Sequence, residues 1–210
     1  MASRSWTCAA TMLLLGCGGV DAVPVDAPTD PTRCSSTIGD RRAPIELIPV
    51  ALEDVVIADG DRVSLLAPPQ GGIVLVAGVR AKNVDGCATQ ITAALRDPVS
   101  NALVGVETRP APLYAGADGW GHPITPTFFA LANVAVCPAT AATRDIFDQP
   151  WIVEFQLEDG ARRAVASRTI TPTCEFVDPM WNCPCQCAAG SVGGTCGVPE
   201  PGVAAAPASN

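Results

Sequence analysis

The chain of 210 residues carries 13 Lys and Arg, 21 Asp and Glu, one His and ten Cys, with a formal net charge of −8. This length allows one domain of ordinary size with a small appendage. A net-acidic chain without a basic cluster does not suit phosphate backbones, which argues against nucleic acid as a partner. Hydrophobic residues make up 48% of the chain and charged residues 16%, so global disorder is excluded. Ten cysteines indicate an oxidising compartment unless they bind metal.

The first residues have the pattern of an export signal. Arg4 supplies a positive charge, and an apolar stretch then runs from Trp6 to Gly16. A transmembrane helix needs about 20 apolar residues, so this stretch is too short to span a bilayer. It suits a signal peptide instead.

A four-residue motif, Leu14-Leu15-Gly16-Cys17, closes the apolar stretch. It resembles the lipobox of bacterial lipoproteins, which has a leucine three positions before a cysteine and a small residue just before that cysteine. The resemblance implies that Cys17 receives a diacylglycerol, that a peptidase cuts after Gly16, and that the protein is anchored to a lipid bilayer of the cell envelope. The alternative is an ordinary secretory signal cut after Ala22. Both alternatives export the protein.

The chain then divides into parts of different composition. Behind the signal peptide of residues 1–16, residues 17–33 form an acidic, proline-rich tether. Residues 34–173 form a β-rich domain, and residues 174–197 form a cysteine-rich cap with few aliphatic side chains. Residues 198–210 are expected to be a disordered tail.

Short apolar stretches separated by turn residues predict a mainly β fold. In chain order, strands are expected at 45–57 (interrupted by Pro49), 62–66, 73–79, 89–96, 103–108, 124–136, 151–157 and 162–171. Gly-containing turns at 59–61 and 158–160 predict hairpins. The pattern indicates an antiparallel β-sandwich, Ig-like in the loose sense, with a barrel as the alternative. An immunoglobulin domain proper is not predicted, because no Trp lies in a strand between Cys87 and Cys137.

The stretch 151–157 alternates most regularly. Trp151, Val153, Phe155 and Leu157 are expected to face the core, and the residues between them, Glu154 and Gln156, to face solvent.

Cysteine parity fits the lipoprotein interpretation. Cys8 leaves with the signal and Cys17 carries the lipid, so eight of the ten cysteines remain, an even number. We expect disulfides, with open connectivity, among Cys34, Cys87, Cys137, Cys174, Cys183, Cys185, Cys187 and Cys196. The Cys183-x-Cys185-x-Cys187 spacing is tighter than that of zinc sites, and alternating cysteines on an extended segment point to opposite sides. No metal or cofactor is therefore expected, and a metal or redox role of this cluster is the alternative.

The longest connection between expected strands, 110–123, holds the candidate binding residues. It contains the only Tyr, the only His and one of the four Trp, namely Tyr114, Trp120 and His122. Aromatic side chains on a loop of a rigid sandwich suit contact with a protein or glycan partner. The alternative is that Tyr114 and Trp120 fold back over the core, with His122 in water or stacked on Trp120.

The motifs of common enzymes are missing. The chain has no Gly-x-Ser-x-Gly elbow, no His-Glu-x-x-His and no phosphate-binding loop. Of the acidic pairs Glu53-Asp54, Asp59/Asp61 and Glu158-Asp159, the last two lie in expected turns, where Asp and Gly are favoured for backbone reasons. We therefore predict a non-catalytic binding or structural module. A carbohydrate-active hydrolase built on two carboxylates is the alternative.

Overall fold

The computed structural model describes residues 30–69, 71–174 and 182–192. The signal peptide, tether residues 17–29, Cys196 and the tail 198–210 lie outside the described residues. In chain order the elements are β1 (Glu46–Val50), the 3-10 turn η1 (Leu52–Asp54), β2 (Arg62–Ser64), β3 (Ile73–Lys82), β4 (Thr89–Arg96), β5 (Leu103–Pro110), β6 (Leu113–Ala115), β7 (Gly121–Pro123), β8 (Ala132–Cys137), β9 (Trp151–Asp159), β10 (Arg162–Thr173) and α1 (Cys183–Gln186).

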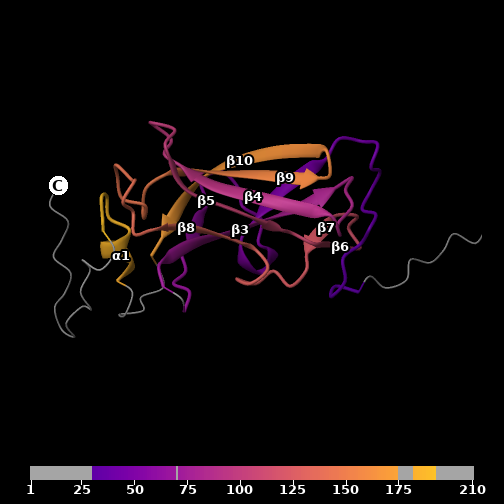
Figure 1. Ribbon diagram of the computed structural model, residues 1–210, viewed down its shortest axis with the longest axis horizontal. Helices are drawn as coiled ribbons and strands as arrows, with labels where there is room; N and C mark the ends of the chain where they lie inside the picture. The colour runs from indigo at the N-terminus through magenta and orange to yellow at the C-terminus, as the bar shows by residue number, and fades with distance from the viewer. Residues whose placement is uncertain (1–29, 70, 175–181, 193–210) are drawn as a thin grey trace, which may run out of the picture.

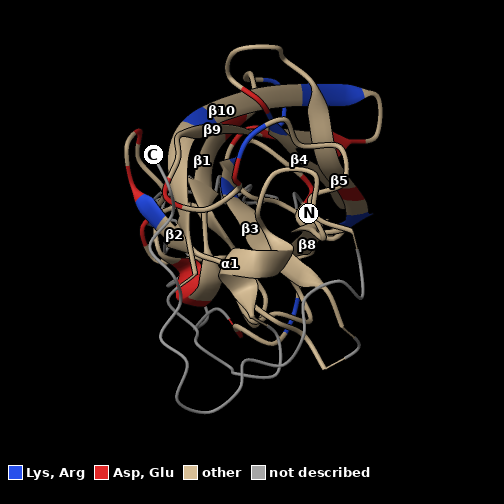
Figure 2. Ribbon diagram, turned by 90° about the vertical axis from the view of Figure 1, so that its left-hand side faces the viewer, with Lys and Arg blue, Asp and Glu red and all other residues tan. Residues whose placement is uncertain are grey.

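Two five-stranded sheets form the β-sandwich that the strand pattern predicted. The first has the order β1-β3-β7-β6, with β8 also paired to β3, and the second has the order β2-β10-β9-β4-β5. Pairing is antiparallel except between β2 and β10, which run parallel. Seen end-on in Figure 2, β10, β9, β4 and β5 arch over β1, β3 and β8, and α1 lies across the near end.

The core lies between the two sheets, and the alternation in β9 placed it correctly. Trp151, Val153, Phe155 and Leu157 are all fully buried, at 0% exposure. β3 is apolar at almost every position because both of its faces are covered. Its inner side chains join the main core, while Val74 and Val76 on the outer face form a second cluster with Leu131.

The two sheets meet closely along one side, where β5 lies beside β8. The side chains of β5 satisfy the backbone of the facing segment: Glu107 accepts the Asn133 N–H, and Arg109 donates to the Leu131 carbonyl. Gly105 has no side chain at the closest approach, where a Cβ would overlap the carbonyl oxygen of Ala135. We call this contact between β5 and β8 the closed seam. It covers one side of the core.

Two turn predictions had different outcomes. Asp159 pairs with Arg162 across a two-residue turn, so the β9–β10 hairpin is confirmed. The hairpin expected at 59–61 is wrong. Val56, before the turn, bridges to Val50 in the first sheet, whereas β2, after it, joins the second sheet. The turn therefore carries the chain between sheets.

Strand predictions failed where prolines and turns interrupt an apolar stretch. Of the strand expected over 124–136, only β8 forms, because Thr125 adopts a left-handed φ of 52° and the backbone turns around Thr127. The connection 110–123 is not a plain loop, since it contains the paired strands β6 and β7.

In the described part of the cysteine-rich cap, Cys183–Gln186 forms the short helix α1, where an extended segment was expected. α1 begins after Asn182, whose side chain accepts the Cys185 N–H, and it carries Pro184 in its first turn. Cys183 and Cys187 therefore lie one helical turn apart, on the same side. The expectation that alternating cysteines point to opposite sides is wrong even for an extended segment, where residues two positions apart lie on the same face.

The two ends of the described chain lie at opposite ends of the sandwich (Figure 1). Near the beginning, Ser35 pairs through its N–H with the Leu113 carbonyl and through its hydroxyl with the Ala115 N–H, beside β6 and β7. α1 lies at the other end. Among the described residues, no helix is long and apolar enough to cross a membrane.

Candidate functional site

The three aromatic residues of the candidate binding loop lie on the β6–β7 hairpin, at the edge of the first sheet. The Tyr114 and His122 rings stack with their centroids 5.4 Å apart. Trp120 lies under Lys82, whose Nζ is 4.5 Å from the centre of the indole ring. The expectation that His122 lies in water or stacks on Trp120 is therefore wrong: its ring stacks on Tyr114 and is 13% exposed.

His122 lies between two carboxylates that the sequence did not associate with it. Its Nδ1 is 2.6 Å from Asp54 Oδ2, and its Nε2 is 3.0 Å from Asp118 Oδ1. Asp54 comes from η1, which is 68 residues away along the chain, and Asp118 comes from the turn between β6 and β7. We call Asp54, Arg80, Asp118 and His122 the histidine cluster.

Arg80 completes the histidine cluster from the outer face of β3. Its Nε lies 3.0 Å from both carboxylate oxygens of Asp54, and its Nη2 donates to the Asp54 carbonyl at 2.8 Å. Glu53 and Asp54 both adopt left-handed φ values, 56° and 61°, which are uncommon for residues with a side chain. This backbone conformation presents both the carboxylate and the carbonyl of Asp54 to one guanidinium group.

The electrostatics of the histidine cluster favour an ionised Asp118. Partial burial works to raise the pKa of Asp118. The hydrogen bonds from His122 and from the Trp120 N–H, together with the attraction of the imidazole, outweigh burial and leave this pKa below its usual value. A carboxylate lies at each ring nitrogen of His122, so the imidazole bridges Asp54 and Asp118.

The histidine cluster is suited to holding segments together. Carboxylates occupy both ring nitrogens of His122, which leaves neither for activating a serine, threonine or cysteine nucleophile. Since Asp54, Arg80 and His122 come from η1, β3 and β7, the cluster ties η1 and the β6–β7 hairpin onto the outer face of β3.

The other acidic pairs serve the fold. Asp59 accepts the Thr169 N–H and Asp61 accepts the Ala58 N–H, both at 2.7 Å, which orders the turn between the sheets. Asp159 is buried and ion-paired with Arg41 and Arg162. Neither pair presents two free carboxylates to a shared cleft, as hydrolysis of a glycoside requires.

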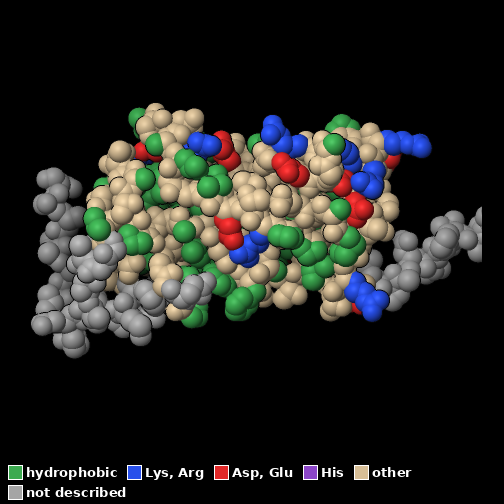
Figure 3. Space-filling view, in the orientation of Figure 1, with side chains coloured by type: hydrophobic (Ala, Val, Ile, Leu, Met, Phe, Trp, Pro, Cys, Tyr) green, Lys and Arg blue, Asp and Glu red, His purple; other side chains and the backbone are tan. Residues whose placement is uncertain are grey.

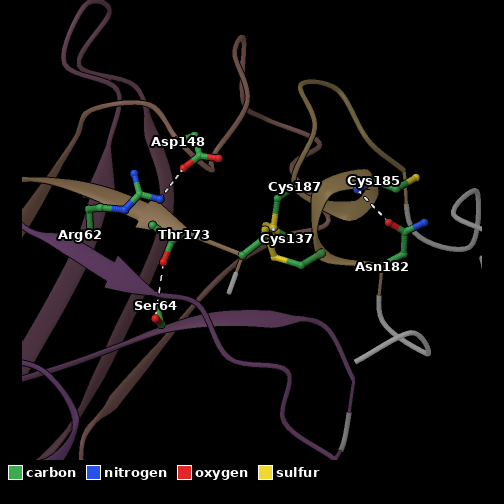
Figure 4. The surroundings of a disulfide bond; sticks show 10 residues. Arg62, Ser64, Cys137, Asp148, Thr173, Asn182, Cys185 and Cys187 are labelled. Carbon is green, nitrogen blue, oxygen red and sulfur yellow. Dashed lines mark hydrogen bonds and ion pairs between the residues drawn. A yellow bond between two sulfur atoms is a disulfide. The ribbon is translucent and has the colours of Figure 1, made fainter. Parts of the chain in front are cut away.

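Disulfides link the described cysteines. The pairs are Cys34–Cys87, Cys137–Cys187 and Cys174–Cys183, and Cys185 is disulfide-bonded as well. Two of these bonds are adjacent: Cys183 Sγ lies 3.9 Å from Cys187 Sγ, and the sulfurs of Cys174, Cys183 and Cys187 lie within 4.8 Å of one another. We call these three residues the sulfur cluster. Figure 4 shows the Cys137–Cys187 bond at the edge of α1.

An apolar groove lies on the side of the sandwich opposite the closed seam, between η1 and β2. Its volume is about 220 Å³. The apolar lining includes Leu52, Val55, Val56, Ile57, Val63 and Val76, and the polar lining comes from Asp61, Arg62 and Ser64. We call it the open-seam groove.

The open-seam groove exposes apolar surface. Val55 is 59% exposed and Val56 45%. On the face shown in Figure 3, charged side chains gather towards the upper edge and one end of the molecule, and hydrophobic side chains reach the surface in its lower part.

No protein-family model matches the chain, and no curated protein matches it. The site must therefore be interpreted from its own geometry.

Sequence reasoning identified part of this geometry. It singled out Tyr114, Trp120 and His122, and the structure brings all three onto one hairpin. It missed Arg80 and Asp118, and it considered Asp54 only as one of an acidic pair in the expected strand region 45–57. The sequence offered one signal for the contact between His122 and Asp54: both residues lie next to apolar strands. This signal cannot predict that two residues 68 positions apart are in contact.

Proposed function

We propose that the chain is a lipoprotein of the bacterial cell envelope, anchored through an acylated Cys17, whose disulfide-bonded β-sandwich acts as a non-catalytic binding or structural module. Its proposed partner is a protein or a glycan. The observation that carries the export part of this proposal is that every cysteine among the described residues is disulfide-bonded. Such bonds persist in oxidising compartments and are rare in the cytosol.

The anchoring part rests on the motif that ends in Cys17. Its position directly after an apolar stretch too short to span a bilayer supports lipidation. Two or more acyl chains on one residue give stable attachment, whereas a single chain gives marginal binding.

The anchoring is tested by Cys17→Ser, with Cys8→Ser as the matched control inside the signal peptide. We expect Cys17→Ser to leave the membrane fraction or to stay unprocessed, and Cys8→Ser to be processed and anchored as before. Membrane fractionation and intact mass distinguish these results. A Cys17→Ser chain that is cut and anchored like the original chain would contradict the proposal.

The non-catalytic part is supported by the histidine cluster, where both nitrogens of the single His are held by carboxylates. The variant His122→Asn tests this role by urea unfolding. It should be less stable than the original chain, because the shorter Asn side chain cannot bridge Asp54 and Asp118. Loss of a hydrolytic activity on envelope glycans in this variant, with stability unchanged, would place the protein among hydrolases.

A metal or redox role is the second candidate, favoured by the sulfur cluster. Cysteine sulfurs bind soft metal ions as thiolates, so the disulfides would have to be reduced before this cluster could hold a metal. Elemental analysis and thiol titration under denaturing conditions separate the two candidates. Stoichiometric zinc or copper together with free thiols would favour the metal site, and disulfides without metal would favour the structural role.

A further inference from the structure

We infer that the open-seam groove binds a small anionic amphiphile, a short acyl chain with a carboxylate, with the chain against η1 and the carboxylate on Arg62. This inference rests on the proposed binding function and gives it a ligand. Its failure would leave the lipid anchoring, which Cys17→Ser tests separately, unaffected.

The shape and lining of the groove set the size and character of the ligand. At about 220 Å³ it is smaller than the roughly 300–1,000 Å³ of pockets that hold drug-sized ligands. One wall is lined by apolar side chains only, those of Ala51, Leu52, Val55, Val56 and Ile57. Val55 and Val56 expose surface that a ligand's hydrocarbon would remove from water. A short hydrocarbon chain fits this wall better than a polar sugar does.

The polar side of the groove comes from β2 and the residue before it. Asp61 is engaged in the turn, where it accepts the Ala58 N–H at 2.7 Å. Ser64 Oγ lies 3.5 Å from Thr173 Oγ1. Arg62 remains as the cationic group of the groove, and its fork of N–H donors matches a carboxylate.

Arg62 already binds one carboxylate, which indicates the kind of group it can hold in the ligand. Its Nη2 lies 2.8 Å from Asp148 Oδ1, as Figure 4 shows. The two side chains are 59% and 58% exposed, and an ion pair this exposed contributes little stability. A ligand carboxylate held in place by hydrocarbon contacts can therefore displace Asp148.

Calorimetric titration with octanoate and with octanol tests the inference. The Cys17→Ser chain recovered from the soluble fraction after signal cleavage serves as the starting protein, because it needs no detergent and carries no lipid that would compete for the groove. We expect saturable binding of one octanoate and weaker binding of octanol. The chain's net charge of −8 repels an anion in general, so a preference for octanoate measures the local effect of Arg62.

Two variants test the contact with the carboxylate in opposite directions. Arg62→Gln should weaken octanoate binding about tenfold, the effect of losing one charge-assisted hydrogen bond, and leave octanol binding unchanged. Asp148→Asn should strengthen octanoate binding, because it removes the carboxylate that competes for Arg62. Equal binding of octanoate and octanol, unaffected by either variant, would overturn the assignment of an anion to Arg62.

The apolar wall is tested by Val55→Glu, with Val165→Glu as the control. Both valines are 59% exposed, so neither change empties the core, but Val165 lies on the outer face of β10, outside the groove. Val55→Glu should abolish octanoate binding and Val165→Glu should leave it intact. The absence of saturable binding by the starting protein, or equal effects of the two variants, would overturn the inference.

Discussion

Among the described residues, two acidic side chains are buried: Asp159, which is ion-paired, and Asp97, which is 3% exposed. Its carboxylate accepts the Val99 N–H at 2.7 Å and the Ser100 N–H at 3.3 Å, and Thr143 donates to it at 3.2 Å. The Val99 N–H lowers the pKa of Asp97 most. Burial opposes this effect, and Ser100, Thr143 and the charge of Arg144 add to the lowering.

This lowered pKa predicts a pH dependence of stability. Because the pKa of Asp97 is lower in the folded than in the unfolded chain, the stability that it contributes is fully present above the unfolded value of about 3.9. It is lost as the pH falls through the folded value. Asp97→Asn should therefore be less stable than the original chain at pH 7, and the difference should shrink as the pH falls below about 4.

Urea unfolding at a series of pH values measures this difference. Ser100→Ala changes an uncharged side chain in the same turn, so its effect on the free energy of unfolding should be constant with pH. An Asp97→Asn effect that is equally constant would contradict the assignment.

Truncating Phe155 tests how much a core side chain of β9 contributes to stability. Its side chain is fully buried in the centre of β9. Phe155→Ala should lower the free energy of unfolding by about 3–5 kcal/mol, because the ring's contacts are lost and a cavity remains. The neighbouring Gln156→Ala should cost little, and urea unfolding measures both. Equal, small effects would mean that the inward face of β9 is assigned wrongly.

These residues also show what the sequence could reveal. The inward position of Phe155 follows from period-two alternation, because adjacent side chains of a strand face opposite sides. The partners of His122 could not be found in this way. They depend on how η1 crosses the outer face of β3, which is set by two left-handed residues, Glu53 and Asp54, that carry no glycine signal.

At the scale of elements, the closed seam between β5 and β8 depends on one missing side chain. Gly105→Ala would place a Cβ against the Ala135 carbonyl, a backbone atom that cannot move by changing rotamer. The variant should lose about 1–3 kcal/mol of stability, the usual cost of overpacking. Val106→Ala, at an exposed neighbour on the same strand, should change it little. A Gly105→Ala chain as stable as the original would mean that the seam is open in solution.

The elements that sequence analysis found and missed differ in length. Long alternating strands such as β4 and β9 were predicted within a few residues. β6, β7 and α1 span three or four residues each, too short for an apolar period to develop. Their conformation depends on tertiary pairing and disulfides instead of local pattern, as β6 shows by pairing with both β7 and the segment around Ser35.

At the scale of the whole molecule, the cross-links and the strand order act together. Cys34–Cys87 ties the first described residues to the β3–β4 turn, and Cys137–Cys187 ties α1 to the end of β8. The two bonds therefore hold opposite ends of the sandwich. If Cys17 carries the lipid, the end with the β6–β7 hairpin lies nearer the attachment point, and α1 lies at the other end.

The proposed processing fixes the oxidation state expected of the remaining cysteines. If Cys8 leaves with the signal and Cys17 carries the lipid, as proposed, eight of the ten cysteines remain. The seven of these that are described are all disulfide-bonded. With the eighth, Cys196, the parity requires four disulfides and no free thiol, so reduction should raise the intact mass by eight hydrogens.

The cross-links should also matter for stability. The cap has few aliphatic residues with which to form a core of its own, and each disulfide is typically worth about 2–4 kcal/mol. Cys137→Ser with Cys187→Ser, which frees α1 from β8, should therefore lower the free energy of unfolding by about that amount. The prediction of four disulfides is contradicted if the mass gain is smaller than eight hydrogens and elemental analysis finds bound zinc or copper. The sulfur cluster would then hold a metal, and coordination would stabilise the cap.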